Sequence, residues 1–209
     1  MATGKLIVLE GIDGAGTTTQ AERLVLALRA SGRDAHLTRQ PSGGPIGRLL
    51  RDFLLGEHAP VDPTTMALLF AADRADHLSR EVEPALRRGA IVVSDRWYHS
   101  SLAYQGAETD FDWVLTINAR ARRPDLTVLL EVPVELAAMR RKVARRQEEL
   151  YDQLDVQRRV AVGYQRVIER LGSGERIVTC DGSRPVEELG VEILGLVLET
   201  GALPCVSTT

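Results

Sequence analysis

The residues best suited to chemistry form a glycine-rich stretch, residues 11–20, which reads GIDGAGTTTQ. A loop of this kind turns several backbone N–H groups inward, and the start of the following helix adds partial positive charge, so the loop can hold phosphate. The usual pattern is G-x-x-x-x-G-K-[ST], but here Thr17 has the place of the lysine. A threonine hydroxyl hydrogen-bonds a phosphate oxygen without neutralising it. The stretch therefore predicts phosphate binding and leaves the source of the missing charge open.

The elements on either side favour a phosphate loop over a turn that merely connects a strand to a helix. An apolar segment, residues 6–10, comes directly before the loop, and a helical pattern begins at Thr18. Strand, glycine loop and helix in this order are the context that the motif requires. Thr18 also has the place of the hydroxyl that usually contacts Mg²⁺. The residues expected to bind nucleotide phosphates are Gly11, Gly14, Ala15, Gly16, Thr17, Thr18 and Thr19.

The elements that must position this loop alternate between short apolar strands and longer amphipathic helices. Strands are expected at residues 6–10, 35–38, 90–94, 126–132 and 176–180. Helices are expected at residues 20–30, 63–87, 134–149, 156–171 and 185–199. The strands are continuous apolar runs, which is typical of a parallel sheet covered by helices on both faces. Ligands of such α/β folds bind at the carboxyl ends of the strands.

Composition sets limits on the class of protein. The length of 209 residues suits a single domain, residues 1–209. The net charge of −3 gives no sign of a nucleic-acid or membrane binder. The two cysteines, Cys180 and Cys205, favour free thiols in a reducing compartment over a disulfide scaffold. The apolar runs are too short to cross a bilayer, so we expect a cytoplasmic protein.

Three further stretches are more specific than the loop: TRQPSGGPIG at residues 38–47, LLFAADRADHL at 68–78 and SDRWYHSSLAYQG at 94–106. Together with GIDGAG and PDLTVLLEVP at 124–133, they resemble bacterial thymidylate kinases. The resemblance implies transfer of the γ-phosphoryl group of ATP to dTMP, with Mg²⁺, giving dTDP and ADP for dTTP synthesis. It also implies a P-loop NTPase-like three-layer fold with a five-stranded parallel sheet, a helical lid at about residues 140–153, and a homodimer.

The resemblance assigns roles on the acceptor side. Phe70 is expected to stack on the thymine, because a flat apolar face suits an aromatic ring, and Arg74, one turn further along the same helix, to hydrogen-bond the base. Arg96 is expected to clamp the dTMP phosphate with its planar fork, together with Arg39. The residues expected around the base and sugar are Ser100, Ser101, Tyr104 and Gln105. For Phe70 alone, an ordinary core residue is the simpler interpretation; for Arg74, the alternative of a solvated helix arginine is less favoured, because Ala71 and Ala72 leave the helix surface narrow there.

Two aspartates complete the expected site. By resemblance, Asp13 meets the 3′-hydroxyl of the deoxyribose and helps to position the acceptor phosphate. Asp95 is expected to hold Mg²⁺ through water, together with Thr18, or else to orient Arg96; a plain structural salt bridge is the alternative. Phosphoryl transfer depends on positioning and charge neutralisation, so no general base is expected.

A basic cluster follows the fourth strand, in the segment that resembles the lid. Its members are Arg140, Arg141, Lys142, Arg145 and Arg146. Bacterial members with an alanine in the loop, as at Ala15, supply a catalytic arginine from the lid. Arg141 and Arg145 share one helix face and are expected to be catalytic, together with Asp13 and Arg96. For most of the cluster, a solvated helix surface remains the simpler interpretation.

Departures from the family pattern leave other functions open. Gln40 replaces a glutamate linked to metal and acceptor binding, and Trp97 stands where tyrosine or histidine is usual. Thr17 replaces a positive lysine and Gln40 a negative glutamate, so the two changes together can conserve the net charge of the site. The alternatives are a kinase for another nucleoside monophosphate and a nucleotide-binding protein that no longer catalyses.

Overall fold

The computed structural model describes residues 4–144 and 150–201. Its five strands form one sheet in the order β2-β3-β1-β4-β5, and every neighbouring pair is parallel. The strands are β1 (Lys5–Gly11), β2 (Ala35–Arg39), β3 (Ile91–Asp95), β4 (Leu126–Glu131) and β5 (Ile177–Asp181). Each lies within one residue of a predicted strand, so the predicted five-stranded parallel sheet is confirmed.

The helices differ more from the prediction. Those predicted are α1 (Thr17–Ala30), α3 (Pro63–His77), α4 (Glu83–Arg87), α7 (Val134–Val143), α8 (Leu154–Leu171) and α9 (Val186–Glu199). The single helix expected at residues 63–87 contains a π-helical turn, η1 (Leu78–Val82), between α3 and α4. The helix expected to reach residue 149 ends at Val143, and residues 145–149 lie outside the described part of the chain.

Four short helical segments were not expected: α2 (Pro45–Leu54), α5 (Tyr98–Tyr104), η2 (Gln105–Ala107) and α6 (Phe111–Ile117). Three of them, of three to seven residues, are too short to show a sustained apolar periodicity, whereas α2 was missed although Leu50, Phe53 and Leu54 recur at helical spacing. Local signals mark two of the starts. Pro45 is the first residue of α2, where a missing N–H costs nothing, and the carboxylate of Asp110 caps α6 by accepting from Trp113 N.

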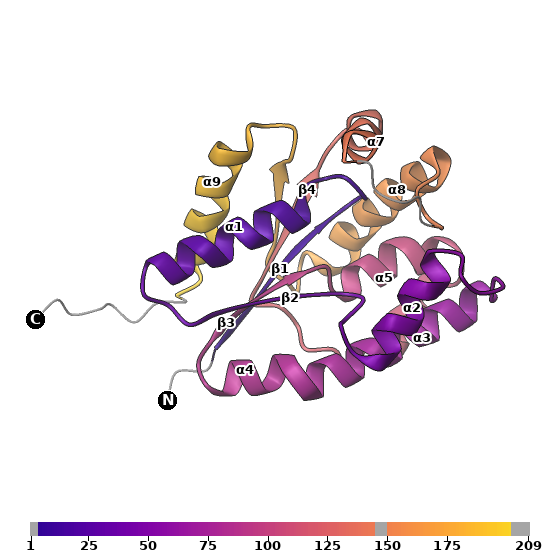
Figure 1. The fold of residues 1–209 in the computed structure, drawn as a ribbon, viewed down its shortest axis with the longest axis horizontal. Helices are drawn as coiled ribbons and strands as arrows, with labels where there is room; N and C mark the ends of the chain where they lie inside the picture. Colours follow the sequence, from indigo (N-terminus) through magenta and orange to yellow (C-terminus); the bar gives the residue numbers. More distant parts are fainter. Residues whose placement is uncertain (1–3, 145–149, 202–209) are drawn as a thin grey trace, which may run out of the picture.

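The three central strands, β3, β1 and β4, are buried on both faces, which explains why they are largely apolar, whereas the edge strands β2 and β5 keep exposed and polar residues. In β1, Ile7 and Leu9 join the core beneath α1 and α9, while the alternate residues Leu6 and Val8 join the core on the side of α4 and α5. Figure 1 shows α1 and α9 over one face and the long α3–α4 rod, α5 and α8 over the other. The result is the predicted three-layer α/β fold.

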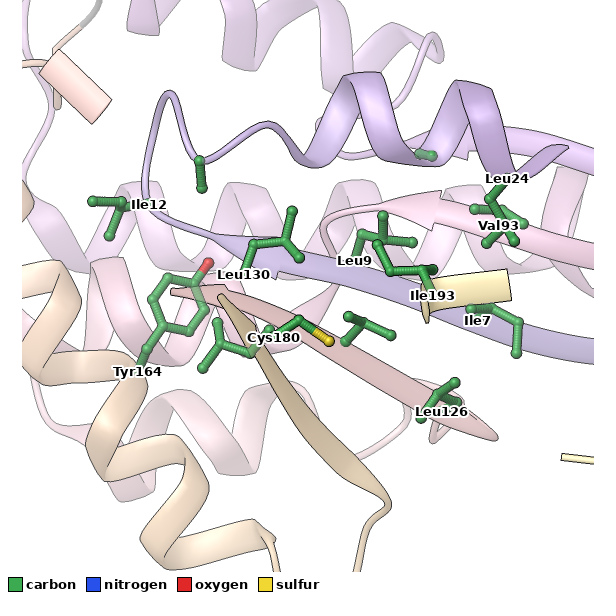
Figure 2. Packing of buried hydrophobic residues seen from close by; sticks show 14 of the residues in the cluster. Ile7, Leu9, Ile12, Leu24, Val93, Leu126, Leu130, Tyr164, Cys180 and Ile193 are labelled. Atoms are coloured by element: carbon green, nitrogen blue, oxygen red, sulfur yellow. The ribbon is translucent and has the colours of Figure 1, made fainter. Parts of the chain in front are cut away.

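The first of these two cores fixes the direction of the helices that flank the phosphate loop. Figure 2 shows Leu24 of α1 beside Val93 of β3, and Ile193 of α9 beside Ile7 and Leu9 of β1. All five side chains are almost fully buried. Since α1 begins at the loop, this packing holds the loop against the carboxyl ends of the strands.

The register of the strands brings the ends of three of them together. Asp95, the last residue of β3, pairs with Leu9 of β1 on one side and with Arg39 of β2 on the other. Residues at the ends of β2 and β3 and in the loop after β1 therefore meet at one edge of the sheet, as predicted. None of the described helices is both long and apolar enough to span a membrane.

Candidate active site

The glycine-rich loop folds between β1 and α1 in a form that requires glycine. Gly14 has φ +90°, and a Cβ there would lie 2.4 Å from the backbone oxygen of Ala137 in α7. Gly16 has φ +101° and is the N-cap of α1. Thr17, at the lysine position, is the first residue of α1 and is only 5% exposed. The first turn of α1 thus faces the site with unpaired N–H groups but without a lysine.

A cavity of about 600 Å³ opens beside this loop. The predicted site residues that line it are Asp13, Gly14, Ala15, Gly16, Thr17, Thr18, Thr19, Arg39, Phe70, Arg74, Asp95, Arg96, Ser100, Ser101, Tyr104, Gln105 and Arg141. Gly11 lies behind the loop, where its carbonyl accepts from Arg96 Nη1 at 2.7 Å. Arg145 and Arg146 lie outside the described residues. Parts of the chain more than a hundred residues apart thus share one cavity.

Thr18 and Asp95, the two residues predicted to hold a metal, lie side by side at the loop. The Thr18 hydroxyl donates to Asp95 Oδ2 at 2.5 Å. Asp95 Oδ1 is buried and has no hydrogen-bond partner among the described residues. A buried carboxylate oxygen without a donor is costly unless a cation or an ordered water satisfies it. Hydroxyl, carboxylate and water oxygens are the ligands that Mg²⁺ prefers, so this pair fits the ion.

Arg96 is held in an unusual backbone conformation at the centre of the site. Its φ is +71°, in the left-handed region, and its N–H donates to Leu9 O at 2.9 Å. The guanidinium donates to Asp13 Oδ1 at 2.7 Å and to Ser100 Oγ at 3.2 Å. Burial acts against its charge, but Tyr104 and Asp13 outweigh burial and raise the pKa of Arg96. A non-glycine residue persists in this region only when its surroundings fix it, which is frequent at functional sites.

The surroundings that fix Arg96 centre on Glu10, a fully buried carboxylate that the sequence analysis did not single out. Its Oε1 accepts from Trp97 N at 2.7 Å, and its Oε2 accepts from Ser100 Oγ at 2.5 Å and from Tyr164 OH at 2.9 Å. His99 Nδ1 lies 3.7 Å from Oε1. Glu10 thereby ties the end of β1 to the residues that follow Arg96. An acidic residue ending an otherwise apolar strand was the available signal.

His99 of α5 links the buried Glu10 to a second carboxylate, Glu175. Its Nε2 lies 3.0 Å from Glu175 Oε2, and the other oxygen of Glu175 accepts from Tyr98 OH at 2.5 Å. Burial opposes the charged imidazole, but the carboxylates of Glu10, in ion-pair distance of Nδ1, and Glu175, hydrogen-bonded to Nε2, prevail and raise the pKa of His99. A buried imidazolium between two carboxylates thus offsets the charge of Glu10.

Asp13 is held on two sides. Arg96 donates to its Oδ1, and Gln157 Nε2 of α8 donates to its Oδ2 at 2.7 Å. The Asp13 N–H donates in turn to Gln157 Oε1 at 2.9 Å. Gln157 was missed by the sequence analysis, although it lies on the buried stripe of α8 with Val160 and Tyr164. A polar residue on an apolar helix face was the signal for its role.

The other end of the cavity is lined by α3 and α5. Phe70 is half-buried, whereas Arg74 is only 2% exposed. Arg74 donates to Gln40 Oε1 at 2.8 Å, to Ser101 Oγ at 3.0 Å and to Asn118 Oδ1. Burial lowers the pKa of Arg74 to about 10. The interpretation of Arg74 as a solvated helix residue is therefore wrong.

Two arginines of the basic cluster reach the phosphate loop from α7. Arg141 donates to Asp13 O and lies 3.2 Å from Asp152 Oδ1. Arg140 donates to Gly182 O at 2.9 Å and to Ala15 O at 3.4 Å. Both line the cavity, and within residues 4–144 and 150–201 Arg140 has no carboxylate partner. Lys142 is exposed and does not line the cavity.

Comparison with known proteins gives a consistent result. The sequence model of the family described as "Thymidylate kinase" matches residues 9–193. The "Probable thymidylate kinase" of Pyrococcus abyssi is 40% identical over 200 residues, which cover 93% of this chain and 96% of the relative. The "Thymidylate kinase" of Thermomicrobium roseum is 40% identical over 92% of this chain and 94% of the relative. The protein of the same name from Methylobacillus flagellatus is 38% identical, over 94% and 98%.

Proposed function

The chain belongs to the thymidylate kinase family, and from that premise we propose how its site performs the reaction. The enzyme is a nucleoside monophosphate kinase that phosphorylates dTMP, with ATP as the donor. The observation that carries the mechanism is the single cavity in which the phosphate loop and the acceptor residues meet. Positioning two anionic substrates in one dry pocket is most of what phosphoryl transfer requires.

We propose that Arg96 and Arg39 hold the phosphate of dTMP. Arg39 is exposed at the end of β2, and no ion pair joins it to another described residue. Arg96 is fixed by Glu10 and Ser100, so its fork is set before the substrate arrives. Asp13, fixed by Arg96 and Gln157, accepts from the 3′-hydroxyl of the sugar. The acceptor phosphate is already an anionic nucleophile, so no side chain needs to remove a proton.

For the base, we propose that Phe70 stacks on the thymine and that Arg74 and Gln105 line its edge. Arg74 is anchored by Gln40, Asn118 and Ser101, so a base would meet a guanidinium that cannot swing away. Ser100, Ser101 and Tyr104 enclose the sugar and the remaining edge. Holding the base in this way places the attacking phosphate oxygen.

For the donor, we propose that the loop N–H groups from Gly14 to Thr19 hold the phosphates of ATP. Thr18 and Asp95 would hold Mg²⁺, directly or through water, and the ion when bound neutralises part of the phosphate charge. Support comes from the buried Oδ1 of Asp95, which lacks a hydrogen-bond donor among the described residues.

The charge that Thr17 lacks is, in our proposal, supplied from α7. Arg140 and Arg141 both lie over the loop, but Asp152 offsets part of the charge of Arg141. Arg140 is held only by backbone carbonyls, Ala15 O and Gly182 O, among the described residues. We therefore assign to Arg140 the larger share of the positive charge that acts on the phosphates. From the sequence, Arg141 and Arg145 were favoured instead of Arg140, and Arg145 lies outside the described residues.

The test is release of ADP from Mg-ATP by the purified chain, with and without dTMP, beside a Thr17→Lys variant. Turnover that depends on dTMP, and is much slower with dUMP or dGMP, is the expected result. If the native chain does not turn over dTMP but Thr17→Lys does, the acceptor site is intact and the loop is disabled. Failure of both would refute the assignment of the acceptor site.

Three expectations about the whole molecule remain proposals. We propose a single domain over residues 1–209 with a lid at about 140–153, a homodimer, and a cytoplasmic location. Light scattering on the eluting peak of a size-exclusion column measures the oligomeric state, and a monomer at micromolar concentration would refute the dimer.

A further inference from the structure

Gln40 stands at a junction between the strands and α3. It follows β2 directly, its backbone N–H donates to Asp95 O at 3.0 Å, and its side chain is 6% exposed. The amide reaches α3, where it contacts Arg74 and His77. The sequence analysis noted Gln40 only as a departure, without a role.

The orientation of this amide follows from what its neighbours can donate. Arg74 Nε lies 2.8 Å from one of the two terminal atoms of Gln40. A guanidinium donates and never accepts, so this atom is the oxygen, Oε1. The nitrogen, Nε2, is then the atom 3.4 Å from His77 Nδ1. An amide nitrogen only donates, so Nδ1 of His77 carries no proton.

The other side of the imidazole ring leads to the same tautomer. His77 Nε2 lies 2.8 Å from Thr38 Oγ1. Thr38 has one hydroxyl proton, which it donates to Glu81 Oε1 at 2.5 Å. Thr38 therefore accepts from His77, whose Nε2 carries the proton. The bonds run in one direction, from the Gln40 amide through His77 and Thr38 to the Glu81 carboxylate.

We propose that Gln40 is a positioning residue that holds His77 as the neutral Nε2–H tautomer and fixes the guanidinium of Arg74 at the wall of the nucleotide cavity. The step to substrate rests on the proposed function, which puts Arg74 at the thymine. A glutamate at this position would accept from Arg74 equally well. It would also accept from His77 Nδ1, while Nε2 still donated to Thr38, so the ring would become an imidazolium.

The charges around His77 agree with a neutral ring. It is 3% exposed, and burial, the largest effect, lowers its pKa. Glu81 of η1 lies 3.6 Å from Nε2 and, like Asp73 of α3, acts in the opposite direction, while Arg74 acts with burial. Glu81 also pairs with His36 of β2 at 2.9 Å, which offsets part of its charge. The ring of Trp97, whose centroid lies 5.9 Å from that of the imidazole in an edge-to-face arrangement, carries no charge.

The direct test is a long-range nitrogen–proton correlation NMR spectrum of the histidine rings in the full chain, which separates the two tautomers and the imidazolium. Only four histidines contribute. We expect His77 to be the Nε2–H tautomer at pH 7 in the native chain and an imidazolium in Gln40→Glu. The exposed Gln153→Glu at the N-cap of α8 adds the same charge elsewhere and should leave His77 unchanged. An Nδ1–H tautomer or an imidazolium in the native chain would overturn the proposal without any variant.

Kinetics test the link to Arg74. Gln40→Met removes the acceptor and should raise the KM for dTMP about tenfold with kcat within about twofold, the effect of one hydrogen bond to a charged group. Gln40→Glu keeps the acceptor and should hold that KM within about threefold. An unchanged KM in Gln40→Met would refute the positioning role.

The two ideas fail separately. If the native chain does not turn over dTMP but His77 has the expected tautomer, the proposed function fails and the role of Gln40 toward His77 stands. If dTMP is turned over and His77 is an imidazolium, the function stands and the inference is wrong.

Discussion

If Arg140 supplies the charge that Thr17 lacks, its removal should matter most while Thr17 is present. The structure places the Arg140 guanidinium at the backbone of Ala15, two residues before Thr17, with no carboxylate partner among the described residues. A cation about 6 Å from a phosphoryl oxygen contributes about 3 kcal/mol at an effective dielectric near 20. Arg140→Ala should therefore lower the rate of phosphoryl transfer roughly a hundredfold.

The same change in a Thr17→Lys background should cost less than about tenfold, because the introduced ammonium already neutralises the phosphates. A single-turnover assay with saturating ATP and dTMP measures the chemical step in the four proteins of this cycle. Arg176→Ala, an exposed arginine at the opposite end of the sheet, is the matched control. Equal effects of Arg140→Ala in both backgrounds, within about 0.5 kcal/mol, would refute the compensation. A large effect of Arg141→Ala instead would move the role to its neighbour.

Three further outcomes follow from the geometry. Asp95→Asn should weaken the binding of Mg-ATP at least about tenfold and leave the binding of metal-free ATP nearly unchanged. Calorimetry without dTMP measures both affinities, and an equal loss of affinity for the two forms of ATP would argue against a metal position. Gly14→Ala should lower the free energy of unfolding by about 1–3 kcal/mol, because φ is +90° and the new methyl group meets Ala137 O; an unchanged urea midpoint would show that α7 moves aside. The folded pKa of His99 is raised, so its ion pairs stabilise the fold fully below about pH 6.5, its unfolded pKa, and the contribution is lost as pH rises through the folded pKa. In His99→Gln, the free energy of unfolding measured by urea titration should not show this decrease between pH 6 and 9. If the decrease persists in the variant, another titrating group causes it.

Much of the fold was predictable because a strand that is buried on both faces has a continuous apolar run in its sequence. The runs that form the central strands β1, β3 and β4 are largely apolar without alternation. The phosphate loop was recognisable for a related reason, since Gly14 must be glycine where α7 packs against it. Both features depend on the types of a few adjacent residues, so they can be recognised in the sequence.

The supporting residues could not be predicted in the same way. Gln157 holds Asp13 across 144 positions of sequence, and Tyr164 reaches Glu10 across 154. Each lies on a helix stripe whose pattern indicates burial but not the identity of its partner. Only the packing of α8 against α5 brings these side chains to the loop. The left-handed backbone of Arg96 was equally hidden, since no glycine or asparagine marks it.

The pairing of His99 with Glu175 has a consequence for how sequences of this kind change over time. Replacing His99 by a neutral residue removes the cation between two carboxylates, Glu175 and the fully buried Glu10, at a cost of about 3–5 kcal/mol. Replacing Glu175 costs less, because Glu10 still faces the imidazolium, so a neutral residue at position 99 is most strongly disfavoured while position 175 keeps its carboxylate. Among related chains, positions 99 and 175 should vary together rather than independently, despite the 76 positions between them. An alignment in which a neutral residue at position 99 commonly accompanies a carboxylate at position 175 would contradict this expectation.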